Sequence, residues 1–196
     1  GKTAFVSGGA GVIGRELVPM LIKCGAKVVV GDLKIPPESF RGNVDYLQGD
    51  LNTITESEVK SIGPEIFFHL AATFERTQET AEFYDENYWN NVRLSSHLMS
   101  LMRKCGELKK VVFASSYLVY DSSKYLSEKS TQSVISLRES DDLLARNLVG
   151  AAKLYHEYEL QFLRETGSGV YGVVCARIFR GYGMGSNCII SRWIRQ

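Results

Sequence analysis

Few features of this sequence point to a membrane protein, a disulfide-stabilised protein or a nucleic-acid-binding protein. The four cysteines are far apart and show no Cys-x-x-Cys spacing, so we expect reduced thiols and no metal site. No apolar run reaches the roughly 18 residues that a membrane span needs, and no basic leader precedes the apolar start. The 23 basic and 22 acidic side chains nearly cancel, without a basic stripe. We therefore expect a cytoplasmic protein that binds neither membranes nor nucleic acids.

What the sequence does contain is a regular alternation of strand-like and helix-like segments. Its 196 residues, 44% of them hydrophobic, suffice for one sizeable core. Short β-branched or aromatic runs alternate with longer helical stretches, which predicts an α/β fold with a doubly wound parallel sheet. We predict strands at Thr3–Ser7, Ala26–Gly31, Val44–Gln48, Glu65–Leu70, Lys110–Ser115 and Gly169–Arg177. We predict helices at Val12–Cys24, Thr55–Ile62, Thr77–Cys105 and Asp141–Glu165, and a surface loop at Asp121–Ser136.

A glycine-rich turn follows the first predicted strand and leads directly into the first predicted helix. It contains Gly9-x-Gly11-x-x-Gly14, the spacing of dinucleotide-binding turns. One glycine allows the tight turn, Gly11 lets the backbone approach a pyrophosphate, and Gly14 allows the helix to pack closely on the strand. The phosphates then meet the unpaired N–H groups of the first helical turn, where Val12 and Ile13 stand. Strand, glycines and helix in this order predict a Rossmann-type nucleotide site.

An acidic residue at the end of the second predicted strand indicates which dinucleotide binds. Asp32 stands 18 positions after Gly14, where a carboxylate accepts hydrogen bonds from the adenosine ribose. The same carboxylate would repel a 2′-phosphate, so NAD is favoured over NADP, and the nearby Lys34 softens this preference without reversing it. We therefore predict NAD as the cofactor, with Asp32 and Leu33 among its contacts.

Further short motifs follow the glycine turn in a fixed order. They are Gly8-x-x-Gly11-x-x-Gly14, Asp50-Leu51, His69-Leu70-Ala71-Ala72, Asn87, Ala114-Ser115-Ser116-Tyr117-Leu118-Val119-Tyr120 and Arg177-x-Phe179-x-x-Tyr182-Gly183. Together they resemble the extended short-chain dehydrogenase/reductases, the nucleotide-sugar epimerases and dehydratases, over nearly the whole chain. The Gly-Thr usually found beyond the family's asparagine is here Asn90-Asn91.

The resemblance implies a role for each motif. Asp50 would contact the exocyclic amine of the adenine and Leu51 its ring. The stretch from Leu70 to Ala72 would lie against the cofactor, as would the backbone near Gly8 and Ser115. Asn87 would help to set the active-site geometry. Ser116 would stand at the position of the catalytic hydroxyl.

The family's Tyr-x-x-x-Lys signature is incomplete in this sequence. The equivalent run is Val149-Gly150-Ala151-Ala152-Lys153, so the lysine is present and the tyrosine is not. In the family the ammonium lowers the pKa of the phenol and holds the nicotinamide ribose, while the phenolate removes a hydroxyl proton. Three explanations stay open: another acid or base, a natural NAD-binding protein without catalysis, or an inactivated variant. Candidate phenols for the first are Tyr117, Tyr120 and Tyr125.

Other residues near the signature have plainer interpretations. His156 is expected to be partly exposed and to pack against a neighbour, because it lies two helical turns beyond Val149. Tyr155 and Tyr158 are expected to pack, and His69 is expected to make a structural hydrogen bond.

The resemblance finally implies a function and an organisation. We expect an NAD-dependent nucleotide-sugar epimerase or dehydratase that acts by transient hydride transfer from a sugar hydroxyl carbon, with Ser116 and Lys153 at its centre. The alternative is a non-catalytic NAD-binding protein of the same fold. Residues 1–180 would form the NAD-binding domain, and 181–196 would begin a smaller substrate domain that is largely absent from this chain. The helices around 77–105 and 141–165 would form a homodimer interface.

Overall fold

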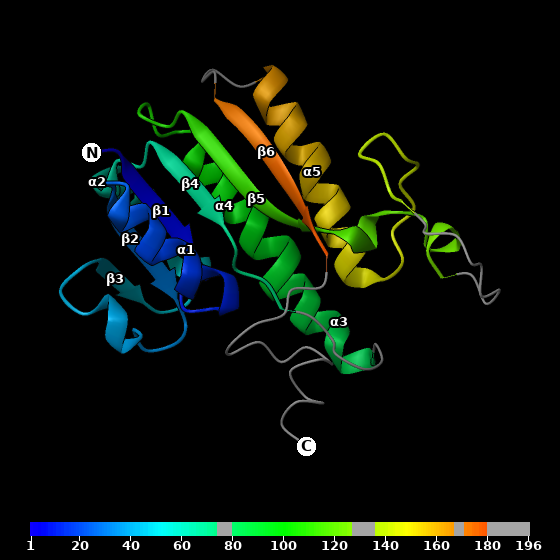
Figure 1. Cartoon of the computed structure of the whole chain (residues 1–196), viewed down its shortest axis with the longest axis horizontal. Coiled ribbons are helices and arrows are strands. Elements are labelled where there is room, and N and C mark those ends of the chain that lie inside the picture. The colour runs from blue at the N-terminus through cyan, green and yellow to red at the C-terminus, as the bar shows by residue number, and fades with distance from the viewer. Residues whose placement is uncertain (74–79, 127–135, 167–170, 180–196) are drawn as a thin grey trace.

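A single parallel sheet organises the part of the chain that the computed structural model describes, residues 1–73, 80–126, 136–166 and 171–179 (Figure 1). Within these ranges the strand order is β3-β2-β1-β4-β5-β6. The strands are β1 (Thr3–Ser7), β2 (Lys27–Asp32), β3 (Asp45–Gln48), β4 (Ile66–His69), β5 (Lys110–Ser116) and β6 (Gly172–Ile178). The chain runs outward from β1 to β3 and then returns to the other side of β1, so the order reverses between β1 and β4. Ligands of such sheets bind at this reversal, beyond the carboxyl ends of the strands.

Helices lie on both faces of the sheet. On one face α1 (Val12–Lys23) packs against β1 and β2. On the other face lie α2 (Glu56–Ile62), α4 (Leu94–Met102) and α5 (Leu148–Thr166), and α3 (Ala81–Asn87) contacts α5 (Figure 1). Short helical turns are η1 (Glu38–Phe40), η2 (Leu51–Thr53), η4 (Tyr117–Val119) and η5 (Ser122–Lys124). The predicted α/β fold with a doubly wound parallel sheet is confirmed.

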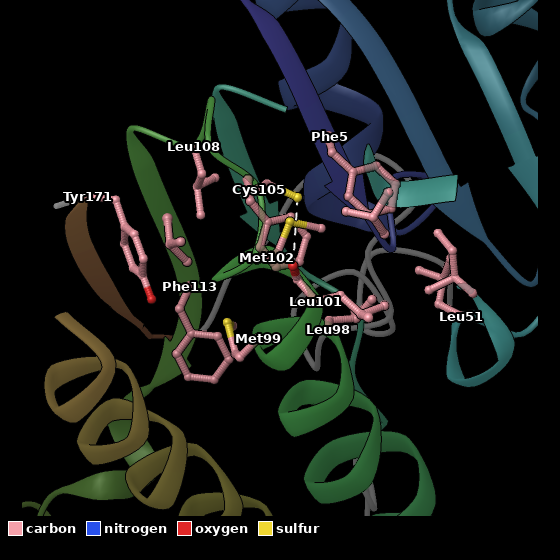
Figure 2. Close-up of a cluster of buried hydrophobic side chains, with 14 of the residues drawn as sticks. Phe5, Leu51, Leu98, Met99, Leu101, Met102, Cys105, Leu108, Phe113 and Tyr171 are labelled. Atoms are coloured by element: carbon pink, nitrogen blue, oxygen red, sulfur yellow. Dashed lines mark hydrogen bonds between the residues drawn. The ribbon is translucent and has the colours of Figure 1, made fainter. Parts of the chain in front are cut away.

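The sheet divides the core in two, because side chains alternate between the faces along each strand. Phe5, Phe67 and Phe113 are fully buried on the face that α2, α4 and α5 cover. The rings of Phe5 and Phe67 stack with their centroids 5.5 Å apart. Figure 2 shows Met99 and Met102 of α4 in the same cluster. The other face carries smaller side chains, Val6, Val28 and Val30, which pack in one cluster with Val18 of α1.

The helix predicted at Thr77–Cys105 is interrupted in the structure. Thr77 lies outside the described residues, and α3 begins at Ala81 because the hydroxyl of Thr80 accepts a hydrogen bond from the backbone N–H of Phe83. The helix then widens into a π-helical segment, η3 (Tyr88–Arg93), before α4 continues it to Met102. Because π-helical segments are rare and often occur at functional sites, this interruption marks the helix as part of a site.

The helix predicted at Asp141–Glu165 begins only at Leu148, so its predicted start was wrong. The side chain of Asn147 accepts a hydrogen bond from the backbone N–H of Gly150 at 2.9 Å, which caps the first turn of α5. The residues before it run extended beside the turn after β5. There the N–H of Arg146 donates to the carbonyl of Leu118 at 3.0 Å, and Tyr120 and Leu143 form an antiparallel bridge. The turn after β5 thus fixes the residues before α5 in a non-helical conformation, and the local sequence pattern of these residues does not show this contact.

The remaining boundaries agree with the predictions to within a few residues. The predicted loop at Asp121–Ser136 contains the turn η5, and its residues 127–135 lie outside the described residues. The predicted start of the sixth strand at Gly169 and the predicted beginning of a substrate domain at 181–196 also lie outside them. No helix of the described ranges is long and apolar enough to span a bilayer.

Candidate functional site

The glycine turn after β1 is shaped by close backbone packing. Gly8 has a φ of +73°, and a Cβ atom at this position would lie 2.6 Å from the backbone nitrogen of Ala71. A Cβ at Gly9 would lie 2.5 Å from Cγ1 of Val30, and one at Gly14 would overlap the backbone of Gly9. These three glycines therefore hold the turn against β2, the start of α1 and the segment after β4. The requirement for glycine at Gly8 and Gly14 agrees with the predicted role of the motif.

Gly11 and the start of α1 face away from this packing. A Cβ at Gly11 would contact only the carbonyl oxygen of Gly8, at 3.1 Å. Gly11 is the N-cap residue of α1, and no side chain caps the helix or places an acid in its first turn. Val12 and Ile13 are about half exposed. Uncapped N–H groups and the positive end of the helix dipole suit a pyrophosphate.

Asp32 ends β2 and is tied to the glycine turn. Its carboxylate accepts hydrogen bonds from the backbone N–H groups of Ala10 and Lys34, both at 2.9 Å. Each carboxylate oxygen can accept a second hydrogen bond, so both can still receive a ribose hydroxyl. Leu33 beside it is mostly exposed. The hydroxyl of Tyr46 donates to the carbonyl of Lys34 at 2.7 Å, and burial, followed by the charge of Asp32, raises the pKa of Tyr46 to about 12.

Asp50 and Leu51 lie at the same edge of the sheet, beyond β3. The carboxylate of Asp50 accepts hydrogen bonds from the backbone and side-chain nitrogens of Asn52, at 2.8 and 3.1 Å, and so caps η2. The side chain of Leu51 is buried, and a Cβ at Gly31 would lie 2.8 Å from it. Both residues thus have structural partners, while Asp50 itself remains exposed toward the edge where an adenine is expected.

His69 ends β4 and has a structural role, as expected. Its Nδ1 and Nε2 atoms make hydrogen bonds with the hydroxyls of Ser7, at 2.6 Å, and Ser95, at 2.8 Å. Burial holds the pKa of His69 well below its ordinary value, and the positive charges of Lys153 and His156 lower it further. The imidazole is therefore neutral. It joins β1, β4 and α4 behind the segment Leu70–Ala72, whose backbone meets Gly8.

Asn91, which the sequence did not single out, makes the contacts that anchor the segment after β4. Its side chain accepts from the backbone N–H of Thr73 and donates to the carbonyl of Thr73, both at 2.9 Å. Asn87, the predicted residue, is buried one turn earlier and accepts a hydrogen bond from Asn91 at 2.8 Å. The carbonyl of Asn91, within η3, bonds to Nε2 of His156 at 3.1 Å. Both asparagines thus belong to one buried network that connects the interrupted helix with α5.

His156 is fully buried, so the prediction of partial exposure was wrong. Its Nδ1 atom bonds to Glu159 at 2.7 Å, and Glu159 also accepts a hydrogen bond from Ser96. Tyr155 and Tyr158 are more than half exposed, which contradicts the expectation that they pack. The helical positions were placed correctly, but the burial of each side chain depends on which neighbouring helix covers it.

The two serines at the end of β5 have different surroundings. Ser115 is buried, and its hydroxyl donates to the carboxylate of Glu157. Glu157 also accepts three hydrogen bonds from Arg177, which raise the pKa of that guanidinium, and Arg177 donates to the hydroxyl of Tyr120 at 3.0 Å. Ser116 is only half-buried, and its hydroxyl accepts from the N–H of Leu118 at 3.2 Å. Ser116 can therefore still donate its proton to a ligand.

Lys153 and Val149 lie one turn apart on α5, and both are buried. The Nζ atom of Lys153 lies 4.7 Å from the ring centroid of Phe113 on β5. Burial lowers the pKa of Lys153 to about 8. Between these residues Gly150 touches the turn that begins at Ser116, because a Cβ at Gly150 would lie 2.5 Å from the carbonyl oxygen of Leu118. The structure thus brings the start of α5 to the end of β5, as the predicted site requires.

Three residues of the site were assigned no role from the sequence: Asn91, Gly150 and Glu157. The signal for Gly150 was available, because a glycine in a first helical turn has a poor helix propensity and indicates close packing. No local signal marks Asn91 or Glu157. Among the described residues no three His, Cys, Asp or Glu side chains are grouped to hold a metal ion.

The chain matches the family model of the NAD dependent epimerase/dehydratase family over residues 4–196. The chain belongs to this family. The predicted resemblance is therefore confirmed, and NAD is the cofactor of the epimerase/dehydratase family. The close-packed glycine turn, the uncapped start of α1 and the carboxylate of Asp32 fit that cofactor.

Named relatives agree with this assignment. The chain is 27% identical over 191 residues to UDP-glucose 4-epimerase of Halalkalibacterium halodurans, with 93% of this chain and 52% of that protein aligned. The structure of MoeE5 in complex with UDP-glucuronic acid and NAD is similar with a TM-score of 0.81 and 29% identity, over 100% of this chain and 60% of MoeE5. A UDP-galactose 4-epimerase gives a TM-score of 0.69 and 28% identity, over 88% of this chain and 55% of its own. The chain thus spans between about half and three fifths of these relatives.

Proposed function

We propose that the protein containing this chain is an NAD-dependent nucleotide-sugar epimerase or dehydratase in which Val149 replaces the usual catalytic tyrosine. One observation carries the proposal: the contact between Gly150 and Leu118 brings the start of α5, which carries Lys153, against the turn that begins at Ser116 at the end of β5. A fold that only had to bind a dinucleotide could use Lys153 on the nicotinamide ribose, but it would not need the hydroxyl of Ser116 there.

The cofactor would lie across the reversal of strand order between β1 and β4. The N–H groups at the start of α1 would hold its pyrophosphate, and Asp32 and Asp50 its adenosine half. Lys153 would hold the nicotinamide ribose. Bound NAD would supply a hydride acceptor and donor for the carbon that carries the sugar hydroxyl. Ser116 would steady that hydroxyl by a hydrogen bond.

The substrate class follows from two of the relatives. MoeE5 has been seen with UDP-glucuronic acid and with UDP-glucose, and the Halalkalibacterium relative is a UDP-glucose 4-epimerase. We therefore propose a UDP-sugar as the first candidate, ahead of GDP- and dTDP-sugars.

The test incubates the full-length protein that contains this chain with NAD and a panel of UDP-, GDP- and dTDP-sugars. We expect turnover of at least one sugar that falls about 100-fold or more in Ser116→Ala, since a lost positioning or proton-transfer contact typically costs this much. Ser61→Ala, an exposed serine of α2, is the matched control and should leave turnover unchanged. Turnover that survives Ser116→Ala would contradict the assigned role of this residue.

The alternative is a non-catalytic NAD-binding protein of the same fold. It is favoured by Val149 itself, because a valine has no proton to exchange and closes the family's usual proton route. Tight NAD binding by calorimetry together with no turnover of any nucleotide sugar would support this alternative. Failure to bind NAD at all would overturn both.

We also propose a homodimer through α3, η3 and α5. Tyr155, Tyr158 and Phe162 are more than half exposed at spacings of three and four residues, which places them on one face of α5. Tyr84 on the adjoining α3 is exposed to a similar degree. Exposed apolar groups gathered in this way are typical of interfaces.

The dimer is tested by light scattering at micromolar concentration. We expect a dimeric mass for the wild type and a monomeric mass for Phe162→Glu. Met20→Glu, equally exposed but on α1, is the control and should stay dimeric. A monomeric wild type would count against the proposal.

A further inference from the structure

Lys153 is a buried cation for which the described part of the chain offers no hydrogen-bond acceptor and no ion-pair partner. Only 6% of the residue is exposed. Its Nζ atom lies over the face of the Phe113 ring, which stabilises an ammonium less than a carboxylate would. A charged group in this position is costly, and a protein retains it when the group serves a ligand or a reaction.

The charged and titratable side chains around Lys153 are occupied elsewhere. On β4, His69 is neutral and is bonded to two serines. On α5, His156 is bonded to Glu159, while Glu157 is paired with Arg177 of β6. In the turn after β5, Tyr120 accepts its hydrogen bond from that same arginine. In the ranges that the structure describes, no carboxylate is paired with the ammonium, and burial alone accounts for the fall of its pKa to about 8.

The residue one turn before Lys153 changes what this lysine can do. In the family the phenol of a tyrosine there carries the proton and the lysine assists it. Val149 is buried and has neither a donor nor an acceptor in its side chain. Within the α5 signature, Lys153 is therefore the one group that can gain or lose a proton.

We propose that Lys153 itself is the proton-transfer residue of this site, its uncharged amine being the final acceptor of the proton that leaves the sugar hydroxyl. This inference rests on the proposed function. As the O–H bond breaks, an N–H bond would form at Nζ, and bound NAD would supply the hydride acceptor that oxidation of the same carbon needs. On the return step the ammonium of Lys153 would give the proton back to the same oxygen. Neither step needs another oxidant or base.

The first test measures the protonation of Lys153 directly and does not depend on turnover. The full-length protein is labelled with lysine carrying ¹³C at Cε, and the resonance that is absent from Lys153→Arg is titrated in NMR spectra. We expect this resonance to titrate with a midpoint near pH 8, about two units below an exposed control, Lys23 of α1, assigned in the same way from Lys23→Arg. A midpoint at that of the control lysine would overturn the inference.

The second test uses turnover and cofactor affinity together. Lys153→Arg keeps a charge that can hold the ribose but does not deprotonate, so kcat should fall about 100-fold or more while the affinity for NAD changes only a few-fold. Wild-type kcat should rise with pH, with a midpoint near that of the labelled lysine. Val149→Tyr should raise turnover at neutral pH and move this midpoint by about one unit or more, because a phenol then shares the proton transfer, whereas Val149→Phe should not.

The outcomes separate this inference from the proposed function. Turnover that survives Lys153→Arg with an unchanged pH profile overturns the role of Lys153 and leaves the enzyme assignment standing. NAD binding without turnover in the wild type overturns both and supports the non-catalytic alternative.

Discussion

The carbonyl oxygen of Leu118 lies 2.5 Å from the position that a Cβ atom would occupy at Gly150. The first turn of α5 therefore rests directly on the backbone of the turn that begins at Ser116. Val149 and Lys153 lie on either side of Gly150 along α5. Because Gly150 has no Cβ atom, this part of the helix can approach the turn that begins at Ser116.

Gly150→Ala tests this contact. Alanine would favour the helix by about 1 kcal/mol were there room for it, but overpacking against a backbone carbonyl typically costs about 1–3 kcal/mol. We expect a net loss of stability in chemical denaturation and a fall in kcat. Gly106→Ala, where an added Cβ meets nothing within 4 Å, is the control and should be near neutral. Equal effects of the two substitutions would show that the close approach does not matter.

Gly8→Ala tests the packing of the glycine turn on the segment after β4. Gly8 and Gly25 have nearly the same φ, +73° and +78°, but only Gly8 has neighbours within 4 Å. Alanine at Gly25 should cost about 1–2 kcal/mol for the left-handed backbone alone. Alanine at Gly8 should cost clearly more and should weaken NAD binding in calorimetry. Similar losses of stability with intact NAD affinity would contradict the assigned role of this turn.

Asp32→Ala tests the adenosine site. The substitution removes an acceptor that would bind the ribose and that also holds Ala10 and Lys34, and charged hydrogen bonds contribute about 1.5–3 kcal/mol. We expect the affinity for NAD to fall about tenfold or more in calorimetry. Asp45→Ala, on an exposed position of β3, is the control and should leave the affinity unchanged. Unaltered binding by Asp32→Ala would remove the basis of the NAD site.

Lys153 also gives a pH dependence of stability. The folded-state pKa of about 8 lies below the ordinary value of 10.5, so between these values the unfolded chain binds more protons and stability rises with pH. The cost of burying the ammonium should be about 2 kcal/mol smaller at about pH 9.5 than at about pH 7. Lys153→Met should remove this part of the slope, as measured by urea denaturation at both pH values. If the free energy of unfolding depends on pH in the same way in the wild type and in Lys153→Met, the predicted contribution of Lys153 is wrong.

Much of the fold and of the candidate site could be predicted because the relevant signals are local. Residues only a few positions apart form the patterns that predict the strands and helices, and the same holds for the glycine turn between β1 and α1. Asp32 was predicted from its place at the end of a strand, and Asp50 and Ser116 from the family resemblance; all three lie at the edge where the parallel strands have their carboxyl ends. The sequence alone shows that Val149 stands where the family has a tyrosine, so the loss of the phenol could be recognised without the structure.

The rest was decided by partners that are far away in the sequence. Ser115 and Glu157 are 42 positions apart, and His156 and Asn91 are 65 apart, so no local pattern could have shown that each pair is hydrogen-bonded. The same holds for the start of α5, which is fixed where Asn147 caps it beside the turn after β5. Sequence alone determined which chemical groups this protein has and in what order they follow the strands. Only the tertiary structure decided which of them are buried and paired and which, like Lys153, are left without an acceptor among the described residues, because desolvation depends on every element packed around a group.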